Sequence, residues 1–318
     1  MLADARRILL PIGAAPEVNS ANKALVESWT LSLHGKAPRT VRHYLDELWR
    51  FVGWLDAHDR PAAAPGDLLA VERKDVEAWL MAQRTAGLAQ ATMRNRWIAL
   101  RNLYGWALAE EEIARNPLER VVVAKAIMPA PEVLADDELK ALLKACAGTD
   151  FYGRRDLALI RFMLATGLRV SETVDLALVD LDLTNRIALV RHGRGDKPRV
   201  VRFDAGTAVA LDRYKRIRAR HSYASLPWLW VGFRGRMTRK GVPTMLNKRA
   251  GEAGIRHVHP HQLRHTWADR WLSAGGNEGD LQRLGGWESA EIMRRYGAAR
   301  AVDRALAAYD TVNPMGKL

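Results

Sequence analysis

The sequence predicts a mainly α-helical protein of two domains: a small helical bundle, followed by a mixed, mostly helical domain with a small antiparallel β-sheet. Three observations support this fold class. The 318 residues are about twice the length of a common domain, and 48% are apolar, so each half can bury a core. Apolar residues recur at helical spacing in both halves, and in one short stretch of the second half apolar and polar residues alternate, as in a β-strand. A proline-containing stretch without periodicity separates the halves.

In the first half, apolar residues recur at the spacing of amphipathic helices, and helix-breaking residues separate the helices. We expect this domain at residues 1–125, ordered from about residue 17, with a linker at 126–131. The predicted helices run from a cap at Asn19 or Ser20 to His34, from Pro38 to Leu55, from Lys74 to Thr85, and from Thr92 to a stop at Asn116-Pro117. Because its tryptophans recur at helical spacing, we expect them in the core rather than on a stacking surface; they are Trp29, Trp49, Trp54, Trp79, Trp97 and Trp106.

The second domain, at residues 132–318, is expected to be helical from Ala135-Asp136 and again from Arg154 to Ala165. Residues 187–203 alternate around a glycine-rich turn, which predicts a β-hairpin. The apolar run Trp228–Val231 is a candidate third strand of the same sheet. Helices occupy most of the remainder.

Charge is distributed unevenly along the chain. Residues 1–130 carry 17 basic and 15 acidic side chains, whereas residues 131–318 carry 32 and 21. Between Arg186 and Arg256 there are 18 basic and only four acidic residues, a density that favours an extended anionic partner such as a polyphosphate backbone. A solvated basic surface is the alternative interpretation.

Other features exclude several classes of protein. No apolar stretch approaches the roughly 20 residues needed to span a bilayer, and no signal-peptide pattern is present, so we expect a cytoplasmic protein. The single cysteine, Cys146, is expected to be buried, and it excludes disulfide and cysteine-zinc frameworks. His261 and His265 have the i, i+4 spacing of a helical metal pair, but Gln262 stands where a catalytic glutamate is needed, so we expect no metal.

Reactive side chains gather in four segments of the second domain. Arg169 and Arg264 are candidates to bracket a phosphate, because guanidinium groups give bidentate and permanently charged donors. Glu172 lies one turn after Arg169 and is expected to hold that guanidinium from the same helix face. The segments are Thr166–Glu172, Gly193–Arg199, His261–His265 and Gly286-Trp287, with Tyr296 nine residues beyond Trp287.

The order and spacing of these four segments resemble the tyrosine recombinase and integrase family, over nearly the whole chain. The first half is similar to that family's core-binding, SAM-like domain at Pro38–Tyr44, at Gly87–Arg94 and at Asn116-Pro117. The two-domain layout most resembles the Xer-like members. The resemblance implies a site-specific recombinase, or integrase, that cleaves and rejoins double-stranded DNA through a Holliday junction.

The resemblance also implies a role for each residue. Tyr296 would attack the scissile phosphate and form a 3′-phosphotyrosyl bond, so that no nucleotide or other cofactor is needed. Arg169, Arg264 and His261 would stabilise the transition state. Trp287 stands where many members have histidine and can donate its indole N–H, and His265 would support the site by hydrogen bonding.

The hairpin turn departs from the usual Xer pattern. Xer-like members present a general-acid lysine between the two glycines, where this chain has Arg194. Lys197 follows three residues later. Arginine holds its proton too firmly to be a good acid at neutral pH, so we predict that Lys197 is the acid and that Arg194 contacts phosphate.

The resemblance further implies a homo-oligomer, a tetramer on two synapsed DNA sites, whose copies exchange their tails. Val302, Leu306 and Tyr309 form the apolar stripe that would dock on a neighbour, unless the tail folds back on its own domain. Whether accessory proteins take part is not encoded in any pattern of the sequence. Two other functions stay open: a catalytically silent DNA-binding protein of the same fold, and a related enzyme such as a type IB topoisomerase or a telomere resolvase.

Overall fold

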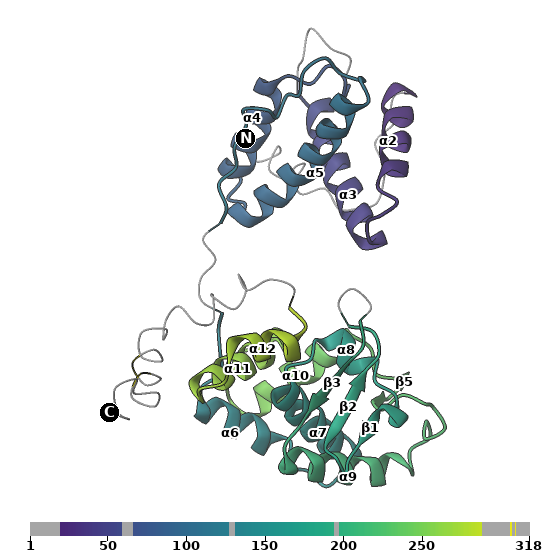
Figure 1. Ribbon diagram of the computed structural model, residues 1–318, viewed down its shortest axis with the longest axis vertical. Coiled ribbons are helices and arrows are strands. Elements are labelled where there is room, and N and C mark those ends of the chain that lie inside the picture. The colour runs from purple at the N-terminus through teal and green to yellow at the C-terminus, as the bar shows by residue number, and fades with distance from the viewer. Residues whose placement is uncertain are drawn as a thin grey trace, which may run out of the picture. The chain divides into compact units, whose positions relative to one another are not determined.

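The computed structural model describes residues 20–58, 66–126, 131–193, 197–287, 306 and 309. The chain divides into two compact units, Met1–Met128 and Pro129–Leu318, each with its own core (Figure 1). Arg194, Tyr296, Val302 and most of the predicted linker lie outside the described residues. No helix in the described part of the chain is both long and apolar enough to cross a membrane.

The first unit is the helical bundle that the sequence predicted. Its helices are α2 (Ser20–Ser32), α3 (Pro38–Asp56), α4 (Arg73–Thr85) and α5 (Gln90–Ala109). α5 packs against the other three. The tryptophan prediction is confirmed: four are buried and two lie partly buried against the same core, the buried ones being Trp29, Trp54, Trp79 and Trp97.

The predicted end of the last bundle helix was wrong. α5 ends at Ala109 rather than at Asn116-Pro117, and Glu111 adopts a left-handed φ of 62° just beyond it. Glu110, Glu111 and Glu112 follow one another at this point. Three negative charges are unfavourable at a helix C-terminus, where the macrodipole is also negative, so the helix ends before the proline.

The second unit surrounds α7 (Phe151–Thr166), which packs against α9, α11, α6 and β3. α7 begins three residues before the predicted Arg154, because the Asp150 side chain caps it by accepting from the Gly153 N–H at 2.9 Å. The remaining helices are α6 (Asp136–Ala145), α8 (Val170–Val174), a 3₁₀ turn η1 (Leu178–Asp180), α9 (Ala205–Arg218), α10 (Gly241–Glu252), α11 (Pro260–Ser273) and α12 (Glu278–Gly285).

The predicted hairpin is confirmed, and its partner strand is not the predicted one. β2 (Ile187–Val190) pairs antiparallel with β3 (Arg199–Arg202), and the third strand of this sheet is β1 (Leu181–Asp182), in the order β1-β2-β3. Trp228–Val231 does not join it. Val231 instead begins β4 (Val231–Gly232), which pairs with β5 (Gly235–Arg236) in a separate sheet.

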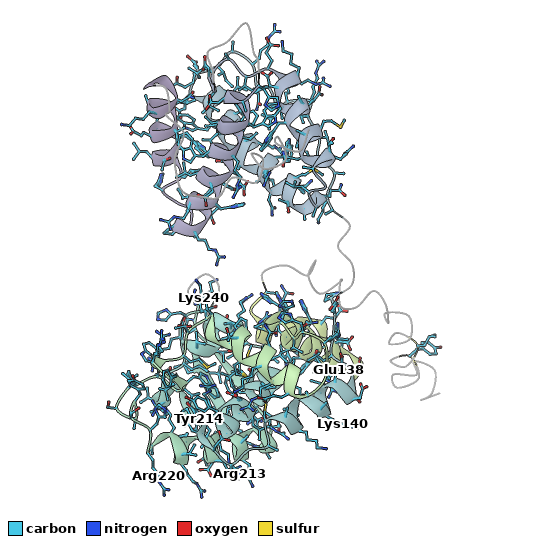
Figure 2. All side chains as sticks on the ribbon, turned by 180° about the vertical axis from the view of Figure 1, so that it is seen from behind. Glu138, Lys140, Arg213, Tyr214, Arg220 and Lys240 are labelled. Carbon is cyan, nitrogen blue, oxygen red and sulfur yellow. The ribbon has the colours of Figure 1, made fainter. Side chains whose placement is uncertain are left out.

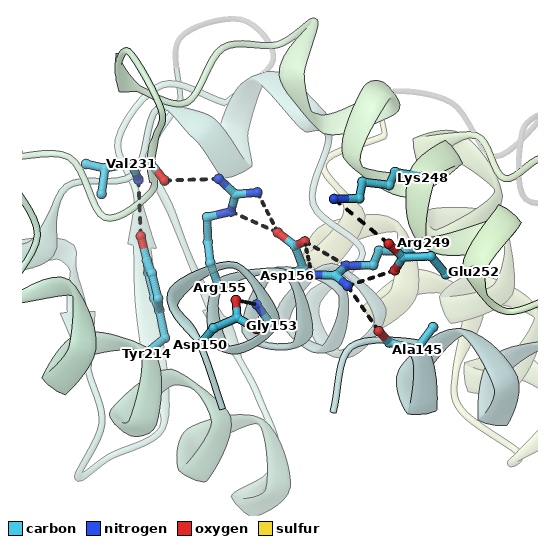
Figure 3. Close-up of polar contacts among 10 residues, drawn as sticks. All are labelled: Ala145, Asp150, Gly153, Arg155, Asp156, Tyr214, Val231, Lys248, Arg249 and Glu252. Atoms are coloured by element: carbon cyan, nitrogen blue, oxygen red, sulfur yellow. Dashed lines mark hydrogen bonds and ion pairs between the residues drawn. The ribbon is translucent and has the colours of Figure 1, made fainter. Parts of the chain in front are cut away.

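A buried ion-pair network joins α7 to α10 (Figure 3). Asp156 accepts from Nε of Arg155 at 2.8 Å on one side and from Nε of Arg249 at 2.8 Å on the other. Arg249 also donates to the Ala145 carbonyl at the end of α6. Cys146, which follows α6, is fully buried as predicted, and burial raises the pKa of its thiol to about 12.

The dense basic stretch does not form a single surface. Arg218 is 2% exposed, and its guanidinium donates to backbone carbonyls of the loop after α9, those of Ala224, Leu226, Trp228 and Leu229. Arg213 and Arg220 lie at one end of the second unit and Lys240 at the opposite end (Figure 2). Part of the basic surplus therefore stabilises the fold, and exposed members such as Arg213 and Lys240 lie far apart on the unit.

Candidate active site

Arg169 lies directly before α8, at the end of the second unit that carries α8 and α12 (Figure 1). Its Nη1 donates to Oε1 of Glu172 at 2.9 Å, and its backbone N–H donates to Oε2 at 2.9 Å. The predicted contact is therefore present, but the predicted shared helix face is wrong. Gly167 ends α7 with a left-handed φ of 62°, and Arg169 is extended, so Glu172 reaches back to it as in a capping box.

Arg264 comes from α11 and is 3% exposed. Its Nη1 donates to the Gly167 carbonyl at 2.6 Å and its Nη2 to the Gly285 carbonyl at 2.6 Å. The guanidinium also lies over the ring of Trp287, with Cζ 4.1 Å from the ring centroid. Trp287 in turn stacks on Trp267, with centroids 6.0 Å apart. Arg264 is thus a rigidly held buried cation.

The C-terminal end of α12 holds three arginines from three different elements. The carbonyl of Leu284 accepts from Arg199 at 3.0 Å, that of Gly285 from Arg264 at 2.6 Å, and that of Gly286 from Arg169 at 3.0 Å. Carbonyls at a helix end have no partner within the helix and carry the negative end of its dipole. Since these three are successive, they gather the guanidinium groups in one place.

Arg199 is the residue of this cluster that was not predicted from the sequence. It lies on β3, and its Nη1 and Nη2 donate to the two oxygens of Glu172 at 3.0 and 2.8 Å. The alternation of the strand could have indicated it. Alternate residues of a strand point to the same face, so Arg199 points to the same face as the buried Val201.

Glu172 remains ionised despite its burial. The carboxylate is 4% exposed, and burial alone would raise its pKa. Hydrogen bonds from Arg199 and from the Arg169 backbone outweigh that effect and hold the pKa of Glu172 below its ordinary value. The site therefore contains one fixed negative charge shared by two arginines.

His261 and His265 lie one turn apart on α11, with ring centroids 6.1 Å apart. Although His261 is an exposed residue, partial desolvation of its ring, reinforced by the charges of Arg264 and Arg169, lowers its pKa below the ordinary 6.5. The ring is thus a neutral group at pH 7. Among the residues that the structure describes, no group of three or more histidine, cysteine or acidic side chains is placed to hold a metal.

We expect the His261 imidazole to protonate only below pH 6.5, because partial desolvation of the ring and then two neighbouring cations disfavour its charged form and lower its pKa. An NMR titration of imidazole-labelled protein measures this pKa directly, with His261→Gln identifying the resonance. The same shift makes the folded state lose stability as the pH falls from 6.5 through the lowered pKa. A resonance that titrates above pH 6.5 contradicts the expectation.

The general-acid candidate lies at the base of the hairpin turn. The Gly193 N–H donates to the Lys197 carbonyl at 3.2 Å, which closes the turn, and the Lys197 side chain is exposed. Gly193 has no room for a side chain, since a Cβ there would lie 2.6 Å from that carbonyl. The structure thus gathers Arg169, Glu172, Arg264, His261 and Trp287, whereas the predicted Arg194 and Tyr296 lie outside the described residues.

Comparison with known proteins identifies the family. Residues 132–302 match the phage integrase family, and residues 26–111 match the N-terminal SAM-like domain of phage integrases. The first match alone spans more than half of the chain. The chain belongs to the phage integrase family.

Relatives within this family are Xer proteins. The chain is 31% identical over 266 residues to tyrosine recombinase XerC of Oceanobacillus iheyensis, which covers 82% of this chain and 85% of that protein. It is 34% identical over 228 residues to XerC of Bacillus licheniformis, covering 70% and 75%. This member of the integrase family is therefore a Xer-like tyrosine recombinase, a site-specific recombinase by activity.

Solved structures confirm the fold class of this recombinase. The Tn1549 transposon integrase in complex with transposon right end DNA gives a TM-score of 0.72 at 20% identity, over 91% of this chain and 99% of that one. The XerH site-specific recombinase bound to a palindromic substrate gives 0.70 at 19% identity, over 96% and 94%. Both likenesses agree with a mostly helical chain that has small antiparallel sheets.

Proposed function

We propose that this recombinase cuts and rejoins double-stranded DNA at specific sites through a 3′-phosphotyrosyl bond to Tyr296 and a Holliday junction. The observation that carries the proposal is the α12 end, where successive carbonyls hold Arg264 and Arg169 side by side. Two fixed guanidinium groups in one place match the oxygens of a single phosphate. The Tn1549 integrase and XerH structures contain DNA or a recombination substrate, which supports duplex DNA as the partner.

The proposed reaction needs no cofactor, because one phosphate ester replaces another. The Tyr296 phenol loses its proton to solvent as its oxygen attacks phosphorus, the bond to the 5′-oxygen breaks, and Lys197 passes a proton to that leaving oxygen and regains one from solvent. Arg169 and Arg264 neutralise the charge that develops on the phosphate. Rejoining is the reverse reaction with the 5′-hydroxyl of another strand.

The remaining side chains have assisting roles in this proposal. The neutral His261 ring and the Trp287 indole donate hydrogen bonds to the phosphate, and the ring face of Trp287 holds Arg264. His265 supports His261 from the next turn of α11, and Arg194 contacts phosphate. Residues 1–125 act as the core-binding clamp and residues 132–318 as the catalytic domain, in a cytoplasmic protein.

We further propose that the recombinase acts as a tetramer whose tails are exchanged between copies. Leu306 and Tyr309 are helical residues three positions apart, and they are 62% and 59% exposed. A groove of about 640 Å³ in the second unit has apolar side chains that fit such a stripe, including Phe203, Trp267, Trp271 and Leu284, and charged ones, Arg186, Arg202 and Asp204, also line it. The tail stripe of a neighbouring copy is the occupant we assign to it.

The test of the function is adduct formation on a nicked suicide substrate that carries the protein's own recognition sequence. Wild-type protein is expected to form a covalent protein–DNA adduct that survives denaturation, and sedimentation of the synapsed complex checks the tetramer. A substrate with a bridging sulfur at the 5′ position needs no proton on its leaving group. It should therefore restore the rate of a Lys197→Ala variant but not that of an Arg194→Ala variant. Salt-sensitive binding without any adduct would instead identify a silent DNA-binding protein.

A further inference from the structure

Arg199 connects three elements through one guanidinium group. It lies on β3, it binds both oxygens of Glu172 beside α8, and its Nε donates to the Leu284 carbonyl at the end of α12. A Cβ on Gly286 would lie only 3.3 Å from its Cζ, so the guanidinium also packs against the α12 turn. Its side chain is 14% exposed. Arg199 therefore lies within the framework of the site rather than on its surface.

The contacts of Arg199 bear directly on the position of Arg169. The Arg169 guanidinium has two anchors, Oε1 of Glu172 and the carbonyl of Gly286. Arg199 donates one hydrogen bond to the first anchor and a second to the other oxygen of Glu172, and its guanidinium packs against Gly286, whose carbonyl is the second anchor. It also follows Lys197 by two residues on the same hairpin. Movement of Arg199 would therefore disturb both anchors and the strand that leads from the general acid.

We propose that Arg199 is a positioning residue for recombination: it fixes Glu172 and the α12 end as one frame that aims Arg169 at the scissile phosphate, and it ties the Lys197 hairpin to that frame. This inference rests on the proposed function. It assigns Arg199 no contact with the reacting atoms. The two terminal nitrogens of Arg199 donate to the two carboxylate oxygens of Glu172, a pairing that the single ammonium group of a lysine cannot reproduce.

The charges around Glu172 make the proposal measurable. Arg199, on β3, and Arg169, directly before α8, both donate to the Glu172 carboxylate. The end of α12 contributes only backbone carbonyls, and α11 places Arg264 and His261 at the same end of the unit. With Arg199 removed, burial is opposed by fewer hydrogen bonds, so the pKa of Glu172 rises. As the pH falls through that raised pKa, Glu172 gains a proton and Arg169 loses an ionised anchor.

The experiment compares adduct formation by wild type and Arg199→Met as a function of pH. We expect the variant to cleave about 10- to 100-fold more slowly, the effect found when a residue that orients a metal ligand is lost and taken here as the scale for a residue that orients Arg169. We also expect the pH profile of the variant to gain an acid limb, which is a fall in rate as the pH is lowered through the raised pKa of Glu172. In wild type Glu172 stays ionised over this pH range, so its titration does not affect the rate. Compared with Arg199→Met, the Arg199→Lys variant should recover only part of the wild-type rate, and its acid limb should lie at lower pH.

Two further variants separate positioning from a general loss of structure. Glu172→Gln has no carboxylate to titrate, so the double variant Glu172→Gln/Arg199→Met should show no acid limb. Its loss of rate should also be smaller than the two single losses combined, because both variants disturb the same contact. Arg191→Met is the matched control, because Arg191 follows β2 of the same sheet and pairs with buried Asp180 at 2.6 Å. It should lose stability without gaining an acid limb.

The outcomes distinguish this inference from the function on which it rests. No adduct from wild type on its own site contradicts the proposed function. An adduct from wild type, with Arg199→Met equal to Arg191→Met in rate and pH profile, overturns the positioning role. If Arg199→Met does not fold, Arg199→Lys decides: a wild-type rate and a flat profile overturn the proposal, and a slower rate with an acid limb supports it.

Discussion

Replacing Tyr296 with phenylalanine is expected to abolish the covalent adduct while DNA binding persists. The phenylalanine ring keeps the shape of the side chain and removes the only oxygen that can be esterified. Loss of a nucleophile reduces turnover on the order of 10⁶-fold in enzymes where it has been isolated, so no adduct should be detectable. Gel electrophoresis of a labelled suicide substrate after denaturation measures this directly.

Binding and cleavage must be measured on the same preparation to interpret this variant. Tyr296→Phe should bind the recognition duplex with the wild-type affinity and salt slope, since phosphate contacts by lysine and arginine determine that slope. Tyr152→Phe is the matched control, because Tyr152 is 40% exposed at the start of α7 and the same atom is removed. An adduct that persists in Tyr296→Phe would assign the nucleophile to another residue.

The described helices and the hairpin could largely be predicted from sequence, because their signals are local. Apolar spacing located α3 and α4 to within a few residues, and the glycine-rich turn with flanking alternation located β2 and β3. Helix ends were less predictable. The stop of α5 depended on three glutamates opposing the helix dipole, and the apparent stop signal at Pro117 lay beyond it.

The partners of the site residues were much harder to predict than the residues themselves. Arg169 and Arg264 could be proposed from their chemistry, and Glu172 as a partner of Arg169, but each arginine is also held by a backbone carbonyl distant in sequence, 117 residues away in one case and 97 in the other. Every residue type carries a carbonyl, so no sequence pattern marks these acceptors. The convergence at α12 emerges only when the chain is folded.

Sequence charge also overstated the surface available to an anionic partner. Arg199, Arg218 and Arg249 all fall in the dense basic stretch, yet each is bound by carboxylates or carbonyls inside the second unit. Buried arginine with several acceptors stabilises a fold by satisfying carbonyls that would otherwise be buried unpaired. A count of basic residues is therefore an upper limit on the cations that meet DNA.

Replacing Arg264 with alanine is expected to reduce the rate of adduct formation by about 10²- to 10³-fold, the effect of losing one fixed donor to a developing charge. The variant also leaves the carbonyls of Gly167 and Gly285 without their 2.6 Å partners and removes the cation over Trp287. Stranding buried polar groups costs about 1–3 kcal/mol each, so the free energy of unfolding should fall as well. Chemical denaturation and single-turnover cleavage measure the two effects separately.

The control for Arg264→Ala is a second buried arginine that is held mainly by backbone carbonyls. Arg218 is 2% exposed and donates to four of them, beyond α9 at the opposite end of the unit from α8 and α12 (Figure 1). Arg218→Ala should lose at least as much stability, yet each folded molecule should cleave at the wild-type rate. Arg264→Lys keeps the charge and should recover only part of the rate, because one ammonium cannot reproduce the two-carbonyl fork. Equal loss of cleavage per folded molecule in the Arg264 and Arg218 variants would mean that Arg264 acts only through folding, and the pairing of Arg169 with Arg264 on one phosphate would have to be abandoned.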